Sequence, residues 1–411
     1  AGSSWAQVFT LCLTRQLVCI SSVVLGQERI HRHLKLQRQQ NPEGKMPPTP
    51  PKPPRNFSKG LLAHLILVPC WTVAPALFLG GCITTGWPHG WKGIIGSLGL
   101  GAALVGSNTM AVRGPLSLVI LGVGLAAPFG RTLATVAAAV CGTLACLCKG
   151  GKKDWGRHPA LWDFLSTWSS HYYEQAELRG ELSNLTKDKA CFAFHPHGCL
   201  AAGFTVNGTY NPEFIKAAGK VNWLCDANLR YKNPFFRMKC DFVRRDDHAI
   251  LAADKKSFTG LMSKGENIAF LPGGFQDAVA HAFGKDVAVL KKRKGFVKYC
   301  LQYGYKLHPV YTFGESETFY TFTGLRKLRM KVSEHNIPMI GFFGWPVFPL
   351  LPRPQAKIIT YIGPALQLPK LEDPSKEDVD KWHGAYIEAL KKLFNDKRAE
   401  AGWPDAVLEI C

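Results

Sequence analysis

The pattern of hydrophobic and polar positions divides the chain into three parts. Residues 1–60 are polar, basic and proline-rich, and they end in the tract MPPTPPKPPRNFSKG. Proline supplies no N–H donor and fixes φ, so such a tract stays extended and unpacked. We therefore expect residues 1–60 to form a disordered, basic N-terminal tail.

The second part, residues 61–148, is apolar. Between Leu61 and Cys148 there is no Asp or Glu, and the fixed charges are Lys92, Arg113 and Arg131. The uncharged run 61–91 is longer than the roughly 20 residues that cross a bilayer core. A buried helix bundle in a soluble protein is the alternative, but 88 residues without an acid are unusual for one. This pattern predicts a membrane-embedded helical region, one helical hairpin or two, followed by a basic cluster of the kind found on the cytoplasmic side.

The third part, residues 149–411, alternates short apolar runs with amphipathic stretches. The runs CFAF, ENIAFLPGG, YKLHPVYTFGE and ITYIGPALQL predict strands, and VNWLCDANL and CDFVRR are two further short apolar segments. Residues 159–185, 249–262, 291–304 and 376–401 predict helices, and 232–237 predict a turn. Alternating strands and helices favour an α/β domain with a mixed, largely parallel sheet and flanking helices, here preceded by transmembrane helices.

The start and end of the last helix are marked clearly. Ser375 and Asp378 have the spacing of a capping box, and Gly402 is a residue of the kind that ends helices. Between them, Tyr386 and Leu390 fall on one apolar side with neighbours at helical spacing.

Two histidines follow the apolar strand CFAF, in the order His195, Pro196, His197 and Gly198. Proline ends a strand, and glycine permits close backbone approach. The result is a pair of imidazoles at a strand end, where α/β sheets bind ligands. Histidine titrates near neutral pH, so proton transfer is the expected chemistry.

A second strand end carries the loop Leu271-Pro272-Gly273-Gly274-Phe275-Gln276-Asp277. Backbone N–H groups of Gly273 and Gly274, together with Gly198, could hold an oxyanion. Asp277 could orient an imidazole if the two strands are neighbours. The alternative is an ordinary tight turn with a solvated Asp.

The cations of a third segment are Lys291, Lys292, Arg293, Lys294 and Lys298. They suit the phosphates of a nucleotide-bearing substrate, although a solvated or membrane-facing patch is the alternative. Gly295, Gly314 and Glu315 are expected to play structural roles, with Glu315 tied to Arg293 or Lys298.

Charge and cysteines limit the class of protein. The chain has 411 residues with a formal net charge of +20, which suits nucleic acid, an anionic membrane or an anionic substrate. We reject nucleic acid because half of the positive excess lies in the first 148 residues. The 13 cysteines are scattered and are expected to be reduced. A metal would need a third ligand beside the two histidines, from Asp277, His281 or His308, and no spacing favours one. We expect neither a metal nor a cofactor.

Four motifs in order resemble the type 2 diacylglycerol acyltransferase family, which includes monoacylglycerol and wax-alcohol acyltransferases. They are FHPHG at 194–198, GGFQD at 273–277, the block RKGFVK to LHPVYTFGE at 293–315, and the tail from IGPALQL to KKLF. The resemblance covers roughly residues 155–411. The family commonly has Glu where Asp277 stands, Ala at Cys300 and Val at His308.

The resemblance implies an endoplasmic-reticulum membrane enzyme whose catalytic domain faces the cytosol, with lipid droplets as a further location. It would transfer a fatty acyl group from acyl-CoA to a neutral lipid hydroxyl, with diacylglycerol as the main expectation. Monoacylglycerol or a long-chain alcohol are alternative acceptors, and a non-catalytic lipid-binding protein is the alternative class. Homo-oligomerisation stays open.

The implied mechanism assigns His197 as general base, with His195 as its positioning partner and Asp277 holding the imidazole. The five cations bind acyl-CoA, and Pro196 supports the turn. A covalent route through Cys191 or Cys199 is disfavoured, because a thioester is already activated.

Overall fold

The computed structural model describes residues 54–68, 155–334 and 339–411. Nearly all of the expected tail and most of the expected membrane region, residues 61–148, lie outside these ranges. Within the described ranges, no helix has both the length and the apolar character needed to cross a membrane.

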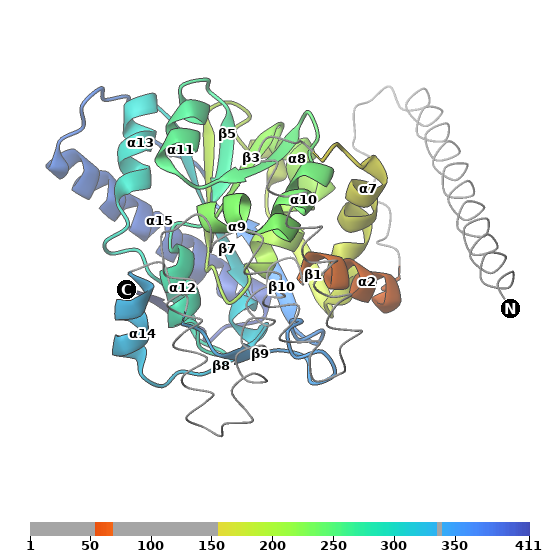
Figure 1. Ribbon diagram of the computed structural model, residues 1–411. Coiled ribbons are helices and arrows are strands. Elements are labelled where there is room, and N and C mark those ends of the chain that lie inside the picture. The colour runs from red at the N-terminus through yellow and green to blue at the C-terminus, as the bar shows by residue number, and fades with distance from the viewer. Residues whose placement is uncertain (1–53, 69–154, 335–338) are drawn as a thin grey trace, which may run out of the picture. The chain divides into compact units, whose positions relative to one another are not determined.

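A mixed sheet forms the centre of the domain (Figure 1). Its strands run in the order β1-β10-β7-β2-β5-β3-β4, and β11 pairs with β7. Their bounds are β1 Gln175–Arg179, β2 Ala190–His195, β3 Val221–Cys225, β4 His248–Ala252, β5 Asn267–Phe270, β7 Lys306–Phe313, β10 Lys357–Ile362 and β11 Leu366–Gln367. Strand β10 is antiparallel to β7, while β7, β2, β5, β3 and β4 are parallel to one another. The carboxyl ends of β7, β2 and β5 therefore meet at one edge.

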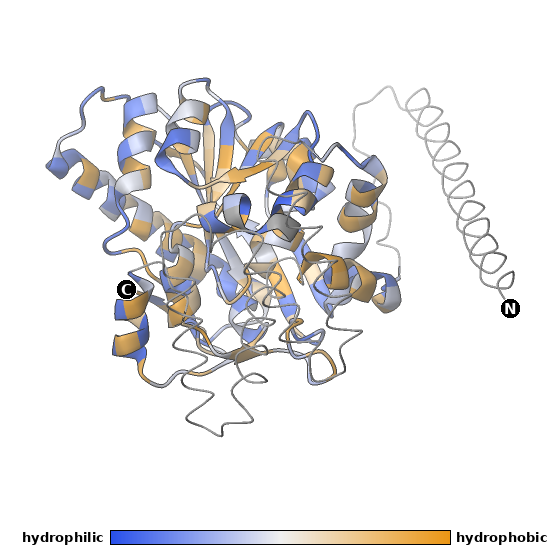
Figure 2. Ribbon diagram, viewed as in Figure 1, coloured by the Kyte–Doolittle hydropathy of each residue, from blue (hydrophilic) through white to orange (hydrophobic). Residues whose placement is uncertain are grey.

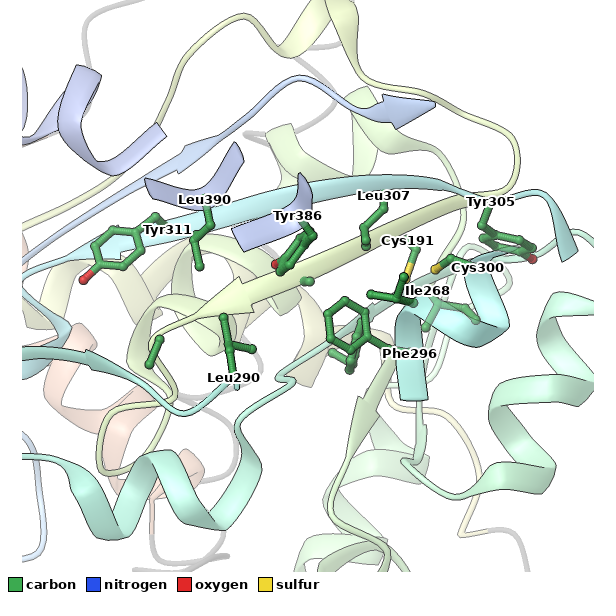
Figure 3. Packing of buried hydrophobic residues seen from close by; sticks show 14 of the residues in the cluster. Cys191, Ile268, Leu290, Phe296, Cys300, Tyr305, Leu307, Tyr311, Tyr386 and Leu390 are labelled. Atoms are coloured by element: carbon green, nitrogen blue, oxygen red, sulfur yellow. The ribbon is translucent and has the colours of Figure 1, made fainter. Parts of the chain in front are cut away.

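Helices cover both faces of this sheet. One layer contains α11 Lys255–Met262, α13 Gly295–Tyr303 and α15 Lys376–Ala401; the other contains α7 Pro159–Trp168, α8 Pro212–Ala218, α10 Pro234–Phe242 and the π-helix η5 Gly203–Thr209. Side chains of β2 alternate between the layers, as a pleated strand requires. Cys191, which Figure 3 shows, and Ala193 join the core of α13 and α15. Phe192 and Phe194 join the other core.

The remaining elements are short. They are η3 Ser169–Tyr172, η4 Leu182–Asn184, α9 Ala227–Lys232, α12 Gly274–Ala280, β6 Asp286–Ala288, η6 Glu315–Glu317, β8 Tyr320–Thr321, α14 Arg326–Ser333, β9 Phe342–Phe343 and β12 Leu408–Ile410. Strands β8 and β9 form an antiparallel pair, and β12 pairs in parallel with β6.

Helix α2, Phe57–Leu67, crosses the boundary that the sequence placed at residue 60. The Asn56 side chain caps it by accepting a hydrogen bond from the Lys59 N–H, 3.1 Å away. Ala63 and Leu67 are buried in the same core as α7 and β2. The first turns of the apolar run therefore pack on the α/β domain.

Three secondary-structure expectations were wrong. The helix expected over 159–185 ends at Trp168, and Gln175–Arg179 form β1, which pairs with β10. Residues 249–252 belong to β4 and pair with β3, so the second expected helix begins only at Lys255. The expected turn at 232–237 instead starts helix α10, because the Asn233 side chain caps it and Pro234 occupies the first turn.

Helix α15 confirms its sequence signals. The reciprocal Ser375–Asp378 capping box is present, and Gly402 ends the helix in the left-handed region at φ 106°. Tyr386 and Leu390 are fully buried and pack in the cluster of Figure 3. Figure 2 shows hydrophobic and hydrophilic residues on the same helix, as one buried face predicts.

Truncating Leu390 tests how much α15 stabilises the domain. Leu390→Ala should lower the free energy of unfolding by about 2–5 kcal/mol, since it leaves a cavity in a closed core. The nearby exposed control, Lys392→Ala, should change it by less than about 0.5 kcal/mol. Thermal unfolding of the purified chain in detergent measures both, and equal effects would contradict the packing described.

Candidate functional site

The site lies where β7, β2 and β5 end side by side. Strand β2 ends at His195 and continues into Pro196, His197 and Gly198, and the His195–Pro196 peptide bond is cis. Strand β5 leads through Gly273 into α12, which carries Asp277. Because these strands are parallel neighbours, the loops that the sequence singled out separately are brought together.

Asp277 holds the backbone of residues 195–198, which we call the histidine turn. Its Oδ2 accepts a hydrogen bond from the His197 N–H at 3.2 Å, and its Oδ1 accepts one from the Val289 N–H. Burial raises the pKa of Asp277 to about 7, although both N–H donors act to lower it. The expected bond from Asp277 to an imidazole is not among the hydrogen bonds of the described residues. The Asp277 carboxylate therefore positions the main chain of His197 and not its imidazole ring.

Gly273 makes the approach of Asp277 possible. A Cβ at Gly273 would collide with the Asp277 carboxylate. Gly274, the first residue of α12, has φ 52°, a left-handed value that favours glycine.

Glu315 holds the other side of the same turn. Its fully buried carboxylate accepts hydrogen bonds from the N–H groups of Ala202 (2.9 Å) and Gly203 (2.7 Å), at the start of η5. Burial raises its pKa to about 7, against the lowering effect of these two donors. The expected tie from Glu315 to Arg293 or Lys298 was therefore wrong.

Two glycines make room for Glu315 and its loop. Gly198 has φ 60°, and a Cβ there would collide with the Glu315 carboxylate. Gly314, with φ 78°, lies against the backbone carbonyl of Lys357. Gly295 is different, because a Cβ there would meet nothing within 4 Å. A structural need for glycine thus exists at 198 and 314 but not at 295.

His195 is a buried, neutral imidazole. It occupies the position of β2 that faces α15, its Nε2 lies 2.7 Å from the Tyr386 hydroxyl, and its exposed fraction is 0%. Burial lowers its pKa to about 3. The sequence had marked Tyr386 only as an apolar-face residue, and no pattern indicated its polar contact.

His197 is partly exposed and has a different environment. Its Nδ1 lies 3.1 Å from the carbonyl oxygen of Gly198, which can only accept, so the ring proton is assigned to Nδ1. This tautomer leaves the lone pair on Nε2. Burial lowers the pKa of His197, and backbone hydrogen bonding, chiefly to the Gly198 carbonyl, partly offsets the shift, with a smaller contribution from the Asp226 carboxylate after β3. Sequence reasoning missed this charge.

His281 is another neighbour of His197. It follows α12, four residues after Asp277, and its Nδ1 lies 3.3 Å from the Thr321 hydroxyl oxygen. Burial lowers its pKa to about 4, and the charge of His197 contributes in the same direction. His308 lies instead within β7, with its Nδ1 bonded to the Gly363 carbonyl. Over the ranges described, no group of three metal-ligating side chains is assembled.

The basic segment, residues 291–298, consists of the loop before α13 and the first turn of that helix. Lys291, Lys292, Arg293 and Lys298 are exposed, and α13 begins only at Gly295. Arg293 donates to the Gln276 amide oxygen at 2.9 Å, and its charge acts on Asp277. Lys294 is paired with Asp380 at 2.6 Å, which makes it the least available of the five cations.

The neighbouring thiols are buried. Cys191 is 0% and Cys199 3% exposed. Burial, and to a lesser degree the nearby Glu315 carboxylate, raises the pKa of Cys199 well above its ordinary value. A thiol held in this state is a poor nucleophile.

Comparison with known proteins places this site in a family. A family model described as diacylglycerol acyltransferase matches residues 148–410. Diacylglycerol O-acyltransferase 2 of Mus musculus is 29% identical over 280 residues, covering 64% of this chain and 69% of its own. Acyl-CoA wax alcohol acyltransferase 1 of Mus musculus is 31% identical over 274 residues, covering 62% and 79%. The protein named diacylglycerol O-acyltransferase 2 in Dictyostelium discoideum is 31% identical over 224 residues, covering 51% and 66%.

No solved structure matches the chain. The family model nevertheless spans the whole α/β domain, with the histidine turn, the α12 loop and the basic segment inside the match. The chain therefore belongs to the diacylglycerol acyltransferase family, in agreement with the type 2 motifs that it carries.

Proposed function

We propose that the chain transfers a fatty acyl group from acyl-CoA to the free hydroxyl of diacylglycerol, giving triacylglycerol. The observation that carries this proposal is the state of His197. Its ring is partly exposed at the carboxyl edge of the sheet and holds a lone pair on Nε2. The names of the relatives support an acyl-CoA-dependent reaction with a neutral lipid. Monoacylglycerol and long-chain alcohols are the alternative acceptors.

In this mechanism Nε2 of His197 takes the proton of the acceptor hydroxyl while the oxygen attacks the thioester carbonyl. The tetrahedral intermediate then collapses, the C–S bond breaks, and the CoA thiolate recovers the proton from the imidazolium. The products are an ester and free CoA, so no cofactor is consumed. In the described ranges, no hydrogen bond engages the N–H groups of Gly198 and Gly274, which suits them for the oxyanion, at about 3 kcal/mol per donor.

The carboxylates have separate roles in this proposal. Asp277 positions the His197 main chain, and Asp226 supplies the negative charge that favours the imidazolium. His195 and Tyr386 form a neutral pair behind the turn. We further propose that the domain works on the cytosolic side of the endoplasmic-reticulum membrane, with lipid droplets as a second location.

An acceptor competition tests the reaction itself. Membranes containing the chain receive one labelled acyl-CoA together with equal amounts of diacylglycerol, monoacylglycerol and a long-chain alcohol. We expect triacylglycerol as the main labelled product. In His197→Ala the rate should fall by about 10³-fold or more, because the base is lost.

His158→Ala is the matched control, since His158 is exposed and makes no capping hydrogen bond. It should keep full activity. If wax ester were the main labelled product, the acceptor would be a long-chain alcohol and not diacylglycerol. If His197→Ala kept a near-normal rate, His197 would not be the general base.

The pH dependence of the rate should report His197. A base must be neutral, and burial holds the pKa of His197 below 6.5. The rate should therefore be level above pH 6.5 and fall as the pH drops through that lowered pKa. Asp226→Asn removes a charge that raises this pKa, so the acidic limb should move to lower pH.

Asn at 226 can still accept the Leu229 N–H bond that caps α9, so the fold is kept. Profiles of kcat/KM against pH for wild type and Asp226→Asn measure the shift. An acidic limb at the same pH in both proteins would contradict the interaction.

The exposed cations should bind the phosphates of acyl-CoA. Lys292→Ala should raise the KM for acyl-CoA about tenfold, the loss expected for one charge-assisted contact. It should leave the KM for the corresponding acyl-pantetheine unchanged, because that thioester lacks the nucleotide. Lys256→Ala, an exposed cation of α11, is the control. An equal rise for both thioesters would show that Lys292 acts on the site and not on the phosphates.

A further inference from the structure

An exposed apolar surface lies next to the site, and nothing in the proposed reaction uses it. Of the fourteen large hydrophobic side chains that are exposed within the described ranges, nine fall between residues 320 and 350. They are Tyr320 (36% exposed), Phe322 (57%), Leu325 (64%), Leu328 (49%), Met339 (43%), Phe343 (48%), Val347 (63%), Phe348 (41%) and Leu350 (38%). We call residues 318–334 and 339–353 the apolar platform. Single exposed apolar residues are ordinary, but nine in so short a stretch mark an interaction site.

Ring contacts form two groups within the platform, which the short segment from Phe343 to Trp345 connects along the chain. Tyr320 of β8 lies 5.0 Å from Phe343 of β9 between ring centroids, and it stacks on Phe283 at 4.5 Å. At the other end, Trp345 lies 5.6 Å from Phe348 and 5.7 Å from Phe57 of α2. The platform therefore extends from β8 and β9 to the helix that begins the apolar run at residue 61.

The charges of the platform are mostly positive. Residues 318–353 contain five cations, Arg326, Lys327, Arg329, Lys331 and Arg353, and one acid, Glu334. Lys327 and Lys331 are exposed. Helix α14, which carries them, also presents Leu328, so hydrophilic and hydrophobic residues alternate along it (Figure 2). Aromatic and aliphatic side chains beside lysines match the headgroup layer of an anionic bilayer, whereas protein interfaces are depleted in lysine.

Leu325 adds a conformational argument. It precedes α14 with φ 53°, in the left-handed region that a bulky side chain rarely adopts. Leu325 is also 64% exposed. Insertion of its side chain into lipid would remove this apolar surface from water.

The platform also contacts the site. The Thr321 hydroxyl donates to the His281 carbonyl oxygen at 2.9 Å, directly after α12. Phe319 lines a small cavity together with Tyr173, Leu200 and Ala202. Leu200 and Ala202 belong to the loop that follows His197. A lipid surface against the platform would thus lie beside the histidine turn.

We propose that the apolar platform docks on the surface of an anionic lipid bilayer, with its aromatic and aliphatic side chains at the boundary of headgroups and acyl chains. Phe322, Leu325 and Val347, the most exposed of them, enter deepest. Lys327 and Lys331 contact the lipid phosphates. This docking is separate from any transmembrane helix, and it does not depend on acyl transfer.

Photo-crosslinking of the full chain in anionic vesicles of phosphatidylcholine and phosphatidylserine tests the proposal. Benzoylphenylalanine replaces Phe322 or Phe343 in the platform, or Tyr231 of α9 as the control. Tyr231 is matched to Phe322, since the two are 58% and 57% exposed. After illumination, we expect lipid adducts at 322 and 343 in at least about tenfold higher yield than at 231. The same yields in the His197→Ala background would show that docking is independent of turnover.

Charge reversal supplies the second arm. Lys327→Glu with Lys331→Glu should lower the adduct yield at 322 several-fold in phosphatidylserine vesicles. Lys255→Glu with Lys256→Glu makes the same charge change on α11, which Figure 1 shows at the opposite end of the domain from β8 and β9, and it should have no effect. Peptide mapping separates the outcomes. Adducts at 322 and 343 to a second copy, to another protein or to another segment of this chain, in place of lipid, would overturn the proposal, as would equal lipid yields at 322 and 231.

Discussion

Two buried carboxylates clamp the backbone on either side of the histidine turn, and the site depends on this clamp. Asp277 accepts the His197 N–H, and Glu315 accepts the N–H groups of Ala202 and Gly203. A turn that leaves a strand beside a proline has N–H groups without ladder partners, and in a buried setting each must find an acceptor. The two acids supply those acceptors, and Gly198 and Gly273 give them room. Removing either acid would expose unsatisfied donors inside the domain and would release the turn.

The clamp has an electrostatic cost that shapes the site. Burial raises the pKa of both acids to about 7, so their charge is retained only against a large desolvation penalty. Each acid titrates nearer 4 in the unfolded chain, so the folded state binds more protons between about pH 4 and pH 7. The contribution of these two groups to stability is therefore greatest below pH 4 and declines as the pH rises towards 7. The same burial keeps His195 and His197 neutral near pH 7, and a neutral imidazole is the form that accepts a proton.

The sequence was informative where local chemistry decides the structure. The end of β2 at a proline and the capping box of α15 followed from residue types. The proximity of the histidine and glycine loops depended on whether β2 and β5 are neighbours, and the structure shows that they are. Strand β1 was mistaken for helix because all five of its residues are half-buried, which leaves no alternation to detect. The partners of Asp277 and Glu315 were missed for another reason. Both acids bind main-chain N–H groups. Nearly every residue type has such a group, so no residue pattern in the sequence indicates which one an acid will bind. The pairing of Tyr386 with His195 joins residues 191 positions apart, and only the packing of α15 on β2 determines it.

An acyl-CoA-dependent lipid acyltransferase must bring together two substrates with opposite solvent requirements. The phosphates of CoA are stable in water and beside cations, while a diacylglycerol leaves the bilayer only at the cost of exposing its chains. Helix α12 lies between the two surfaces that would meet these needs. Arg293 of the basic segment contacts Gln276 in α12, and Thr321 of the apolar platform contacts His281 directly after it. Because α12 also carries Asp277, one short helix links the donor side, the acceptor side and the His197 backbone. Any shift of α12 caused by a ligand at either surface would therefore move the His197 backbone. This connection could couple the binding of each substrate to the position of the base.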